Sequence, residues 1–278
     1  MNGVLFINKE SGVTSRDVVN KICKIYHTKK VGHTGTLDPL ATGVLVVCLG
    51  SYTKLVSKIT AYEKEYVATM KLGILTDTGD ITGKIIKKVN KEISKEKIRE
   101  CFEKFPKEYL QTVPKYSAVK VNDKKMYEYA RENIEISLPK RQVQIKELEV
   151  LNISKDEITF RVLVSKGTYI RSLIEDLASE METVATMTSL KRTKQGNIFL
   201  EECVNVNDLN ETYPLKTLEE LFNYPKVELD EVNFERVKNG NKLSLEAKDD
   251  VVFVIYQEQI VGIYEKDDDI YRFVFKTI

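Results

Sequence analysis

The residues best suited to chemistry lie in one glycine-rich segment, residues 30–43, which reads KVGHTGTLDPLATG. It places one carboxylate, Asp38, directly before Pro39, with the imidazole of His33 five residues upstream. A carboxylate on a rigid turn can attack, remove a proton or stabilise positive charge, whereas most aspartates before proline simply form a turn. The segment lacks the lysine triplet of a Walker loop and the dinucleotide fingerprint. We predict a long loop that presents a candidate acid and leads into a strand beginning at Val44.

A second candidate cluster, residues 164–171, reads VSKGTYIR and joins a predicted strand to a predicted helix through Gly167. In the first turn of that helix, Arg171 is able to pair with a carboxylate from another loop, and Tyr169 is able to form the wall of a pocket. The alternative is a surface arginine beside a half-buried tyrosine. Tyr66, in the run EYVAT, fits a strand residue that serves either the same site or only the core.

Hydrophobic periodicity predicts the elements that must position these side chains. Strands are expected at residues 4–8, 44–49, 65–72, 143–151 and 158–164. A capping box at Thr14 opens the first helix, Ser94 caps a second, and a third extends from about Tyr169 to Met181. Because strands and helices mix without regular alternation, we predict an α+β fold with a mixed, mostly antiparallel sheet.

Charge is distributed unevenly along the chain, although the formal total is only +1. Residues 1–142 contain 26 basic and 16 acidic side chains, whereas residues 201–278 contain 9 basic and 18 acidic ones. Such asymmetry indicates different partners for the two parts. In the acidic part, short strands are expected at residues 251–256, 260–264 and 270–275. We predict a large domain over residues 1–225 and a small β domain over residues 226–278.

Residues 115–141 combine basic side chains with tyrosines. The set includes Tyr116, Lys120, Lys124, Lys125, Tyr127, Tyr129 and Arg131. Basic side chains suit phosphates and tyrosine rings suit stacking, so the pattern indicates a surface that faces nucleic acid. From the pattern alone, a lysine-rich helix face in solvent is an equally good interpretation.

Several classes of protein are excluded. The longest apolar run, residues 44–49, is far too short to span a membrane, and the start, MNGVLFI, has no basic segment ahead of an apolar one. The four cysteines are scattered, and with only two histidines neither a disulfide framework nor a metal site is expected. We expect a reduced, cytoplasmic protein that contacts no membrane.

Together these motifs resemble the TruB family of tRNA pseudouridine synthases. Residues 32–43, GHTGTLDPLATG, resemble the family's catalytic loop. Further stretches follow in the family's order at residues 2–12, 64–78, 114–131, 165–171 and 190–193. The resemblance therefore covers roughly residues 1–200. It departs at Glu10, Lys115 and Lys191, where a proline, a small residue and an arginine are usual, and none of these touches the carboxylate.

The resemblance implies a pseudouridine synthase fold with a thumb insertion at about residues 112–142 and a small C-terminal domain of the PUA type. It assigns the reaction at C1′ of the target uridine to Asp38, the holding of that carboxylate to Arg171, and stacking on the uracil to Tyr66. The substrate-binding residues it implies are His33, Lys9, Tyr169 and Leu190, and the thumb residues are Tyr116, Lys120, Lys124, Lys125, Tyr127 and Arg131.

Within that set, the resemblance implies that His33 fills the stack vacated by an extruded uridine and that Lys9 adds positive charge to the RNA-facing side of the cleft. The implied substrate is the tRNA T stem-loop, whose uridine at position 55 is flipped out of the loop. The reaction it implies needs no cofactor and no metal, and we expect a monomer.

Two other functions fit the same residues. One is a non-catalytic protein that binds or folds tRNA on the same scaffold, although such a protein has no need of a buried acid. The other is a guide-RNA-dependent relative that modifies ribosomal RNA. Such relatives usually carry extra N-terminal segments or basic tails, so we favour a stand-alone enzyme.

Overall fold

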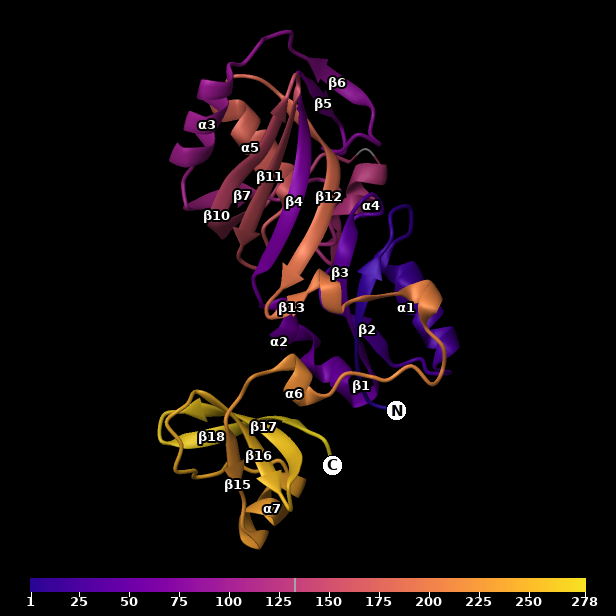
Figure 1. Cartoon of the computed structure of the whole chain (residues 1–278), viewed down its shortest axis with the longest axis vertical. Helices are drawn as coiled ribbons and strands as arrows, with labels where there is room; N and C mark the ends of the chain where they lie inside the picture. Colours follow the sequence, from indigo (N-terminus) through magenta and orange to yellow (C-terminus); the bar gives the residue numbers. More distant parts are fainter. Residues whose placement is uncertain (133) are drawn as a thin grey trace.

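The computed structural model of the chain describes residues 1–132 and 134–278. Its main sheet consists of β1 (Gly3–Lys9), β2 (Val31–His33), β3 (Thr42–Leu49), β4 (Lys64–Leu72), β7 (Glu108–Thr112), β10 (Lys140–Ser154), β11 (Glu157–Val164), β12 (Ala185–Gln195), β13 (Ile198–Phe199) and β14 (Val204–Asn205). The strand order is β14-β1-β3-β12-β4-β11-β10-β7, with β2 beside β3 and β13 beside β12 (Figure 1). The pairs β1–β14 and β3–β12 are parallel and the others are antiparallel. The prediction of a mixed, mostly antiparallel sheet is confirmed.

Two helices, α3 (Lys95–Lys104) and α5 (Ile170–Glu180), cover one face of the main sheet (Figure 1). Helix α1 (Ser15–Ile25) starts at the predicted capping box, in which Thr14 accepts a hydrogen bond from the Asp17 amide. The shorter helices are α2 (Val56–Thr60), α4 (Met126–Arg131), α6 (Leu218–Leu221) and α7 (Glu231–Lys238). Each of the three helices expected from the sequence therefore begins at the residue that the pattern indicated.

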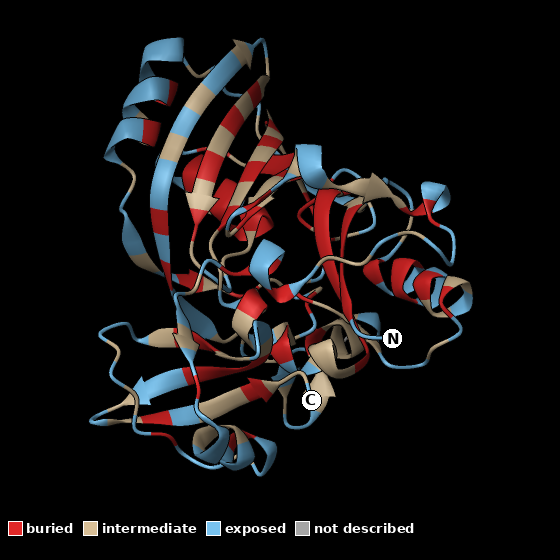
Figure 2. Ribbon diagram, turned by 60° about the horizontal axis from the view of Figure 1, so that its bottom comes forward, coloured by how far each residue is buried: buried red, intermediate tan, exposed pale blue. Residues whose placement is uncertain are grey.

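Strands β1 and β3 are almost wholly buried, because both of their faces are covered. On one face Leu5 and Ile7 join the cluster that holds the apolar side of α1. On the other face Val4 and Phe6 pack in a second cluster that includes residues of the C-terminal sheet. Figure 2 shows these central strands buried and α3 largely exposed. The segment of residues 30–43 therefore leads into a strand that is buried on both faces.

A projection separates β7 from β10 in the sequence. It contains β8 (Lys120–Val121), β9 (Lys124–Lys125) and α4, and it corresponds to the predicted thumb. Residue 133, which falls within the predicted thumb at residues 112–142, lies outside the described residues. A separate hairpin of β5 (Ile74–Thr76) and β6 (Ile85–Lys88) leads from the end of β4.

The C-terminal residues form a four-stranded sheet of β15 (Lys226–Glu228), β16 (Val251–Tyr256), β17 (Gln259–Asp267) and β18 (Ile270–Lys276). Three of these strands agree with the predicted runs. The sheet packs on the body, where the rings of Tyr52 and Phe275 meet edge to face with centroids 5.3 Å apart. Because one apolar cluster joins both parts, the division at residue 226 stays a prediction.

The structure contains strands that the sequence analysis did not predict, among them β2, β7 and β12 of the main sheet. Residues 31–33, expected in an irregular loop, form β2, because they can pair with the edge of β3. β12 was not predicted, since its run ATMTSLKRTKQ is largely polar. Two of its buried polar side chains, Arg192 and Gln195, bond to residues 34–44. β7 was also missed, because its run EYLQT is short and mixed.

Candidate active site

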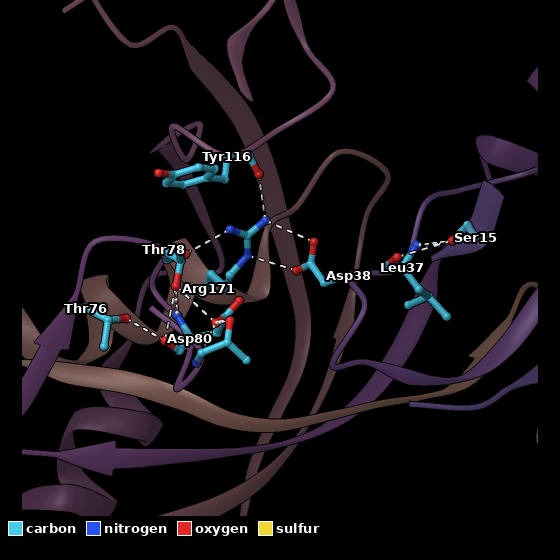
Figure 3. Close-up of polar contacts among 9 residues, drawn as sticks. Ser15, Leu37, Asp38, Thr76, Thr78, Asp80, Tyr116 and Arg171 are labelled. Atoms are coloured by element: carbon cyan, nitrogen blue, oxygen red, sulfur yellow. Dashed lines mark hydrogen bonds and ion pairs between the residues drawn. The ribbon is translucent and has the colours of Figure 1, made fainter. Parts of the chain in front are cut away.

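Asp38 and Arg171 form a two-point ion pair. Arg171 Nε lies 2.9 Å from Asp38 Oδ2, and its Nη2 donates to Asp38 Oδ1 at 3.2 Å (Figure 3). The guanidinium is buried, whereas the carboxylate is 30% exposed. The predicted contact between these two residues, 133 positions apart, is therefore confirmed. The planar fork of an arginine fixes the orientation of a carboxylate as well as its charge.

Two further donors of Arg171 are bound to backbone carbonyls. Nη1 donates to the carbonyl of Thr78 at 2.9 Å, and Nη2 also donates to the carbonyl of Tyr116 at 2.9 Å (Figure 3). One carbonyl comes from the turn after β5 and the other from the start of the thumb. With these partners the guanidinium is fixed in one orientation toward Asp38.

A second buried carboxylate, Asp80, shapes the turn that supplies the Thr78 carbonyl. It accepts hydrogen bonds from Thr78 Oγ1 at 3.0 Å and from the amide and hydroxyl of Thr82 at 3.0 and 2.5 Å. Sequence reasoning missed this residue. The run TDTGDIT was its signal, because closely spaced aspartates and threonines favour turns closed by their own side chains.

Burial and charge act in opposite directions on Asp38. Burial raises the pKa of its carboxyl group above the ordinary value, and the guanidinium of Arg171 opposes that rise. The negative charge of Asp80 raises the pKa further, whereas the ammonium of Lys9 lowers it. Asp38 therefore lies in a partly desolvated site, and the guanidinium of Arg171 stabilises its ionised form.

Lys9 does not lie on the RNA-facing side of the cleft, contrary to the expectation from the sequence. Its side chain is fully buried, and Nζ donates to the carbonyls of Ala41 at 2.6 Å, Glu10 at 2.9 Å and Pro39 at 3.3 Å. Burial lowers the pKa of this ammonium to about 8. The sequence showed a basic residue beside a basic loop, but only the fold shows that the chain of residues 39–41 wraps around it.

Other buried side chains hold the same loop. Ser15 at the start of α1 bonds both backbone groups of Leu37, accepting from its amide at 2.9 Å and donating to its carbonyl at 3.2 Å (Figure 3). Arg192 on β12 donates to the carbonyls of Val44 at 2.6 Å and Gly35 at 3.1 Å. Asp38 therefore belongs to a loop that is fixed at both ends.

The close approach of β12 explains one glycine of the loop. At Gly43 the backbone φ is +100°, and an added Cβ would lie 2.1 Å from the carbonyl oxygen of Arg192. Only glycine fits this position. Neither Gly43 nor Arg192 was singled out from the sequence as a site residue. Gly43 is nevertheless the last residue of the stretch that resembles the family's catalytic loop.

The other predicted site residues lie on the strands and helix behind the loop. Tyr66 on β4 and Leu190 on β12 are each 7% exposed and belong to the same apolar cluster as Leu37. Tyr169 is half-buried at the residue before α5, and burial raises the pKa of its hydroxyl. The structure thus brings these three side chains to the region around the Asp38 loop, while their roles stay predictions.

His33 lies on β2, half-buried. Its Nδ1 accepts a hydrogen bond from the Gly35 amide at 3.3 Å. Burial lowers the pKa of the imidazole, and the nearby cations Arg16 and Arg192 lower it further. The ring is therefore neutral at neutral pH, which fits stacking or hydrogen bonding better than proton donation.

The basic residues of the thumb pair with its tyrosines. Lys124 Nζ lies 5.0 Å from the ring centroid of Tyr129, and Arg131 lies 5.3 Å from that of Tyr127. Lys125 approaches the Tyr127 ring from 5.6 Å. The tyrosines expected to stack on bases contact cations of their own chain in this structure, and their stacking on RNA stays a prediction.

A cavity of about 680 Å³ lies on the thumb side of Arg171. Its lining includes Thr78 and Tyr116, whose carbonyls bind the arginine, together with Ser172 and Glu175 of α5. Asp38, Tyr66 and Leu190 are absent from this lining among the described residues. The cavity therefore lies on the thumb side of Arg171, and Asp38 does not line it.

The described residues contain neither a cluster of metal-binding side chains nor a helix that could span a membrane. Over residues 1–132 and 134–278, no three or more histidine, cysteine or acidic side chains are grouped so as to hold a metal ion. Over the same residues, no helix has the length and apolar character needed to cross a membrane.

The comparisons with known proteins agree with this site. Residues 23–170 match the family described as TruB family pseudouridylate synthase (N terminal domain). A Clostridium tetani protein named tRNA pseudouridine synthase B is 39% identical over 285 residues, covering 99% of this chain and 99% of the relative. The chain belongs to the TruB family. Another TruB relative, from Fusobacterium nucleatum and of the same name, is 40% identical and covers 95% of each chain.

Solved structures share the fold of this TruB chain. The archaeal box H/ACA sRNP Nop10-Cbf5 complex matches with a TM-score of 0.69 and 26% identity, covering 95% of this chain and 78% of that chain. A Cbf5-Nop10-Gar1 complex matches with a TM-score of 0.70 and 27% identity over the same shares. An H/ACA RNP bound to a substrate RNA containing 2'-deoxyuridine has a TM-score of 0.74 at 24% identity. The predicted pseudouridine synthase fold with a small C-terminal β domain is confirmed.

Proposed function

We propose that this TruB chain is the tRNA pseudouridine synthase that isomerises the T-loop uridine at position 55. The observation that carries the proposal is the ion pair of Asp38 and Arg171 on the loop that matches the family's catalytic motif. Relatives at 39% and 40% identity carry the name tRNA pseudouridine synthase B, and they match nearly the whole chain. We infer that the protein acts as a monomer in the cytoplasm, where tRNA is processed.

The reaction breaks the bond between C1′ and N1 of uridine, rotates the freed uracil and forms a bond between C1′ and C5. The proton on C5 is lost to water and N1 takes up a proton, so no atoms other than protons are exchanged. Positive character develops on the sugar as the first bond breaks. The carboxylate of Asp38 serves this step in its ionised form, whether it attacks C1′ or removes a proton to give a glycal.

Arg171 keeps that carboxylate ionised and aimed. Burial alone raises the pKa of Asp38, and the paired guanidinium offsets part of this rise. Tyr66 stacks on the uracil, and Tyr169 and Leu190 form the walls around it. These three roles follow from the family resemblance and from the burial of each side chain beside the loop.

The target uridine must leave the stacked T-loop, which costs roughly a few kcal/mol. Neutral His33, at the edge of the catalytic loop, takes the place of the extruded base. Thumb cations bind the phosphates of the same stem-loop. Lys9 is removed from this set, because its ammonium is buried under the loop and supports Asp38 from behind.

The experiment that tests the proposal uses unmodified tRNA with tritium at C5 of its uridines. The purified chain should release tritium without added guide RNA, and primer extension after carbodiimide treatment should show one pseudouridine, in the T-loop. Asp38→Asn should lower the release rate at least about a thousandfold and leave tRNA affinity within about threefold. The matched control is Asp208→Asn, an exposed aspartate far along the sequence, which should behave as wild type.

The two competing functions give different results in this assay. A protein that only binds or folds tRNA binds the substrate but releases no tritium. A guide-dependent enzyme is inactive until a guide RNA is added; the solved structures that share the fold are of H/ACA particles, which makes this control necessary. Activity of Asp38→Asn within tenfold of wild type would contradict the assignment of the acid.

A further inference from the structure

Gln111 on β7 binds the backbone of an active-site residue. Its side chain is 1% exposed, and Oε1 accepts a hydrogen bond from the Tyr169 amide at 2.7 Å. Its Nε2 donates to the Tyr169 carbonyl at 3.2 Å. One buried amide thus satisfies both backbone groups of the residue that immediately precedes α5 and lies two positions before Arg171.

The start of α5 depends on this contact. Tyr169 is the N-cap residue of the helix, and it makes no side-chain capping hydrogen bond. A helix start without such a cap lacks the side-chain hydrogen bond that commonly fixes its first turn. Gln111 supplies a constraint from another strand, 58 residues away in the sequence.

The amide of Gln111 is itself held in place. Its Nε2 also donates to the hydroxyl of Tyr109 at 2.8 Å, and that hydroxyl donates to Asp176 Oδ2 at 2.8 Å. Asp176 lies in the second turn of α5. The side chains of β7 therefore grip the helix at Tyr169 and again at Asp176, which fixes both its position and its rotation.

The segment that follows Gln111 bonds to the same helix turn. Ser172 Oγ donates to the Thr112 carbonyl at 2.8 Å, and Arg171 Nη2 donates to the Tyr116 carbonyl at 2.9 Å. This segment leads directly into the thumb. The joint between residues 111–116 and the first turn of α5 therefore connects the RNA-binding projection to the arginine that holds Asp38.

We propose that Gln111 is a positioning residue for the isomerisation, acting through the Tyr169 backbone to place Arg171 on Asp38. This inference rests on the proposed function and deepens it. It follows from geometry: a helix start without a side-chain cap carries the arginine that holds Asp38, and the buried Gln111 amide binds both backbone groups of that start. A displacement of about 1 Å at such a place lowers a rate about a hundredfold.

The first test is Gln111→Ala, measured as the single-turnover rate of tritium release and as the tRNA dissociation constant. The rate should fall by about 10- to 100-fold, while the dissociation constant changes less than about threefold. The matched control is Asn152→Ala, which removes an exposed amide from β10 of the same sheet and should leave both values unchanged. Thermal unfolding of each variant shows whether it is folded at the assay temperature.

The second test is Gln111→Glu, whose rate depends on the hydrogen bonds that position 111 can make. It tests the positioning role even if the Gln111→Ala variant is unfolded. A protonated carboxyl group accepts from the Tyr169 amide and has one donor for the Tyr169 carbonyl, so it lacks only the second donor of the amide, whereas an ionised carboxylate has no donor at all. Burial favours the protonated form, so the variant's rate relative to wild type should rise at least about fivefold between pH 8 and pH 6. Position 111 contacts Tyr109 directly and Asp176 through Tyr109, and the charged groups beyond them are Arg141 on β10 and Glu175 and Glu180 on α5. All of these, with Asp38, are present in both proteins, so their own titration contributes to both pH profiles.

The outcomes separate this inference from the proposed function. A wild-type chain that releases no tritium contradicts the proposed function. With active wild type, a folded Gln111→Ala variant within twofold of its rate overturns the positioning role, and so does a Gln111→Glu ratio that stays flat with pH. A rate loss with unchanged affinity and a ratio that rises on acidification support it.

Discussion

Two groups of lysine and arginine side chains in this chain have different surroundings. The loop cations, Lys9 and Arg192, are buried and donate to backbone carbonyls of the Asp38 loop and its flanks. The thumb cations, Lys124, Lys125 and Arg131, lie over tyrosine rings at the surface. Within the described residues neither of the loop cations pairs with a carboxylate, whereas Lys124 of the thumb pairs with Glu132.

The burial of one group and the exposure of the other limit what each can contribute to RNA modification. Charges at the surface attract phosphates and are screened by salt. A buried ammonium or guanidinium that is saturated by carbonyls cannot approach a phosphate, but it fixes the backbone and biases the pKa of nearby acids. We therefore infer that the loop cations set the geometry of catalysis and the thumb cations set tRNA affinity.

The largest effect is expected at the cation that joins the loop to α5. Arg171→Lys should lower the single-turnover rate at least about a hundredfold with tRNA affinity within about threefold, because an ammonium cannot reproduce the planar fork on Asp38. The measurement is tritium release under single-turnover conditions. The control is Arg99→Lys, an exposed arginine on α3. Unchanged turnover of Arg171→Lys would show that the ion pair does not serve the reaction.

Lys9 tests the difference between the two groups, because a Lys9 that binds phosphate would act as the thumb cations do. Lys9→Met should lower the free energy of unfolding by about 2–3 kcal/mol, because three loop carbonyls lose their donor. Denaturant unfolding measures the loss, and exposed Lys95→Met is the control. The salt dependence of tRNA binding should stay as in wild type. Unaltered stability with a shallower salt dependence would place Lys9 on a phosphate.

The thumb cations should show the opposite behaviour. Replacing Lys124 and Lys125 together by glutamate should weaken tRNA binding about tenfold at low salt and flatten the dependence of log Kd on log salt. The rate at saturating tRNA should change less than about threefold. Lys95→Glu with Lys97→Glu on α3 is the matched control. An unaltered salt slope would mean that the RNA binds elsewhere.

The smallest effect concerns the pH dependence. Activity needs ionised Asp38, so the rate should rise with pH through the pKa of that carboxyl group, which burial raises above its ordinary value. The charge of Asp80 raises it further, so Asp80→Asn should shift the midpoint of the rise to lower pH. The pH profile of the single-turnover rate measures the shift. A midpoint that moves upward, or stays, would contradict the electrostatic coupling of the two carboxylates.

Much of the site could be predicted because its signals are local. The run GHTGTLDPLATG has a composition that only a loop accommodates, and the Thr14 capping box and the helix start near Tyr169 follow from neighbouring residues. Chemistry alone suggested that Arg171 pairs with a carboxylate of another loop, and the family resemblance identified that carboxylate as Asp38. The C-terminal strands were predicted because each is a short apolar run bounded by polar turns.

What the sequence determined by itself was therefore the elements, the reactive residue types and the family. Only the tertiary structure decided which cations are buried, that Asp80 shapes the turn on Arg171, that polar β12 lies at the centre of the sheet, and that Gln111 holds the start of α5. The physical reason is separation along the chain. A lysine or an amide takes its role from partners about 30 to 160 residues away, and no local pattern records which of them the fold brings within hydrogen-bond distance.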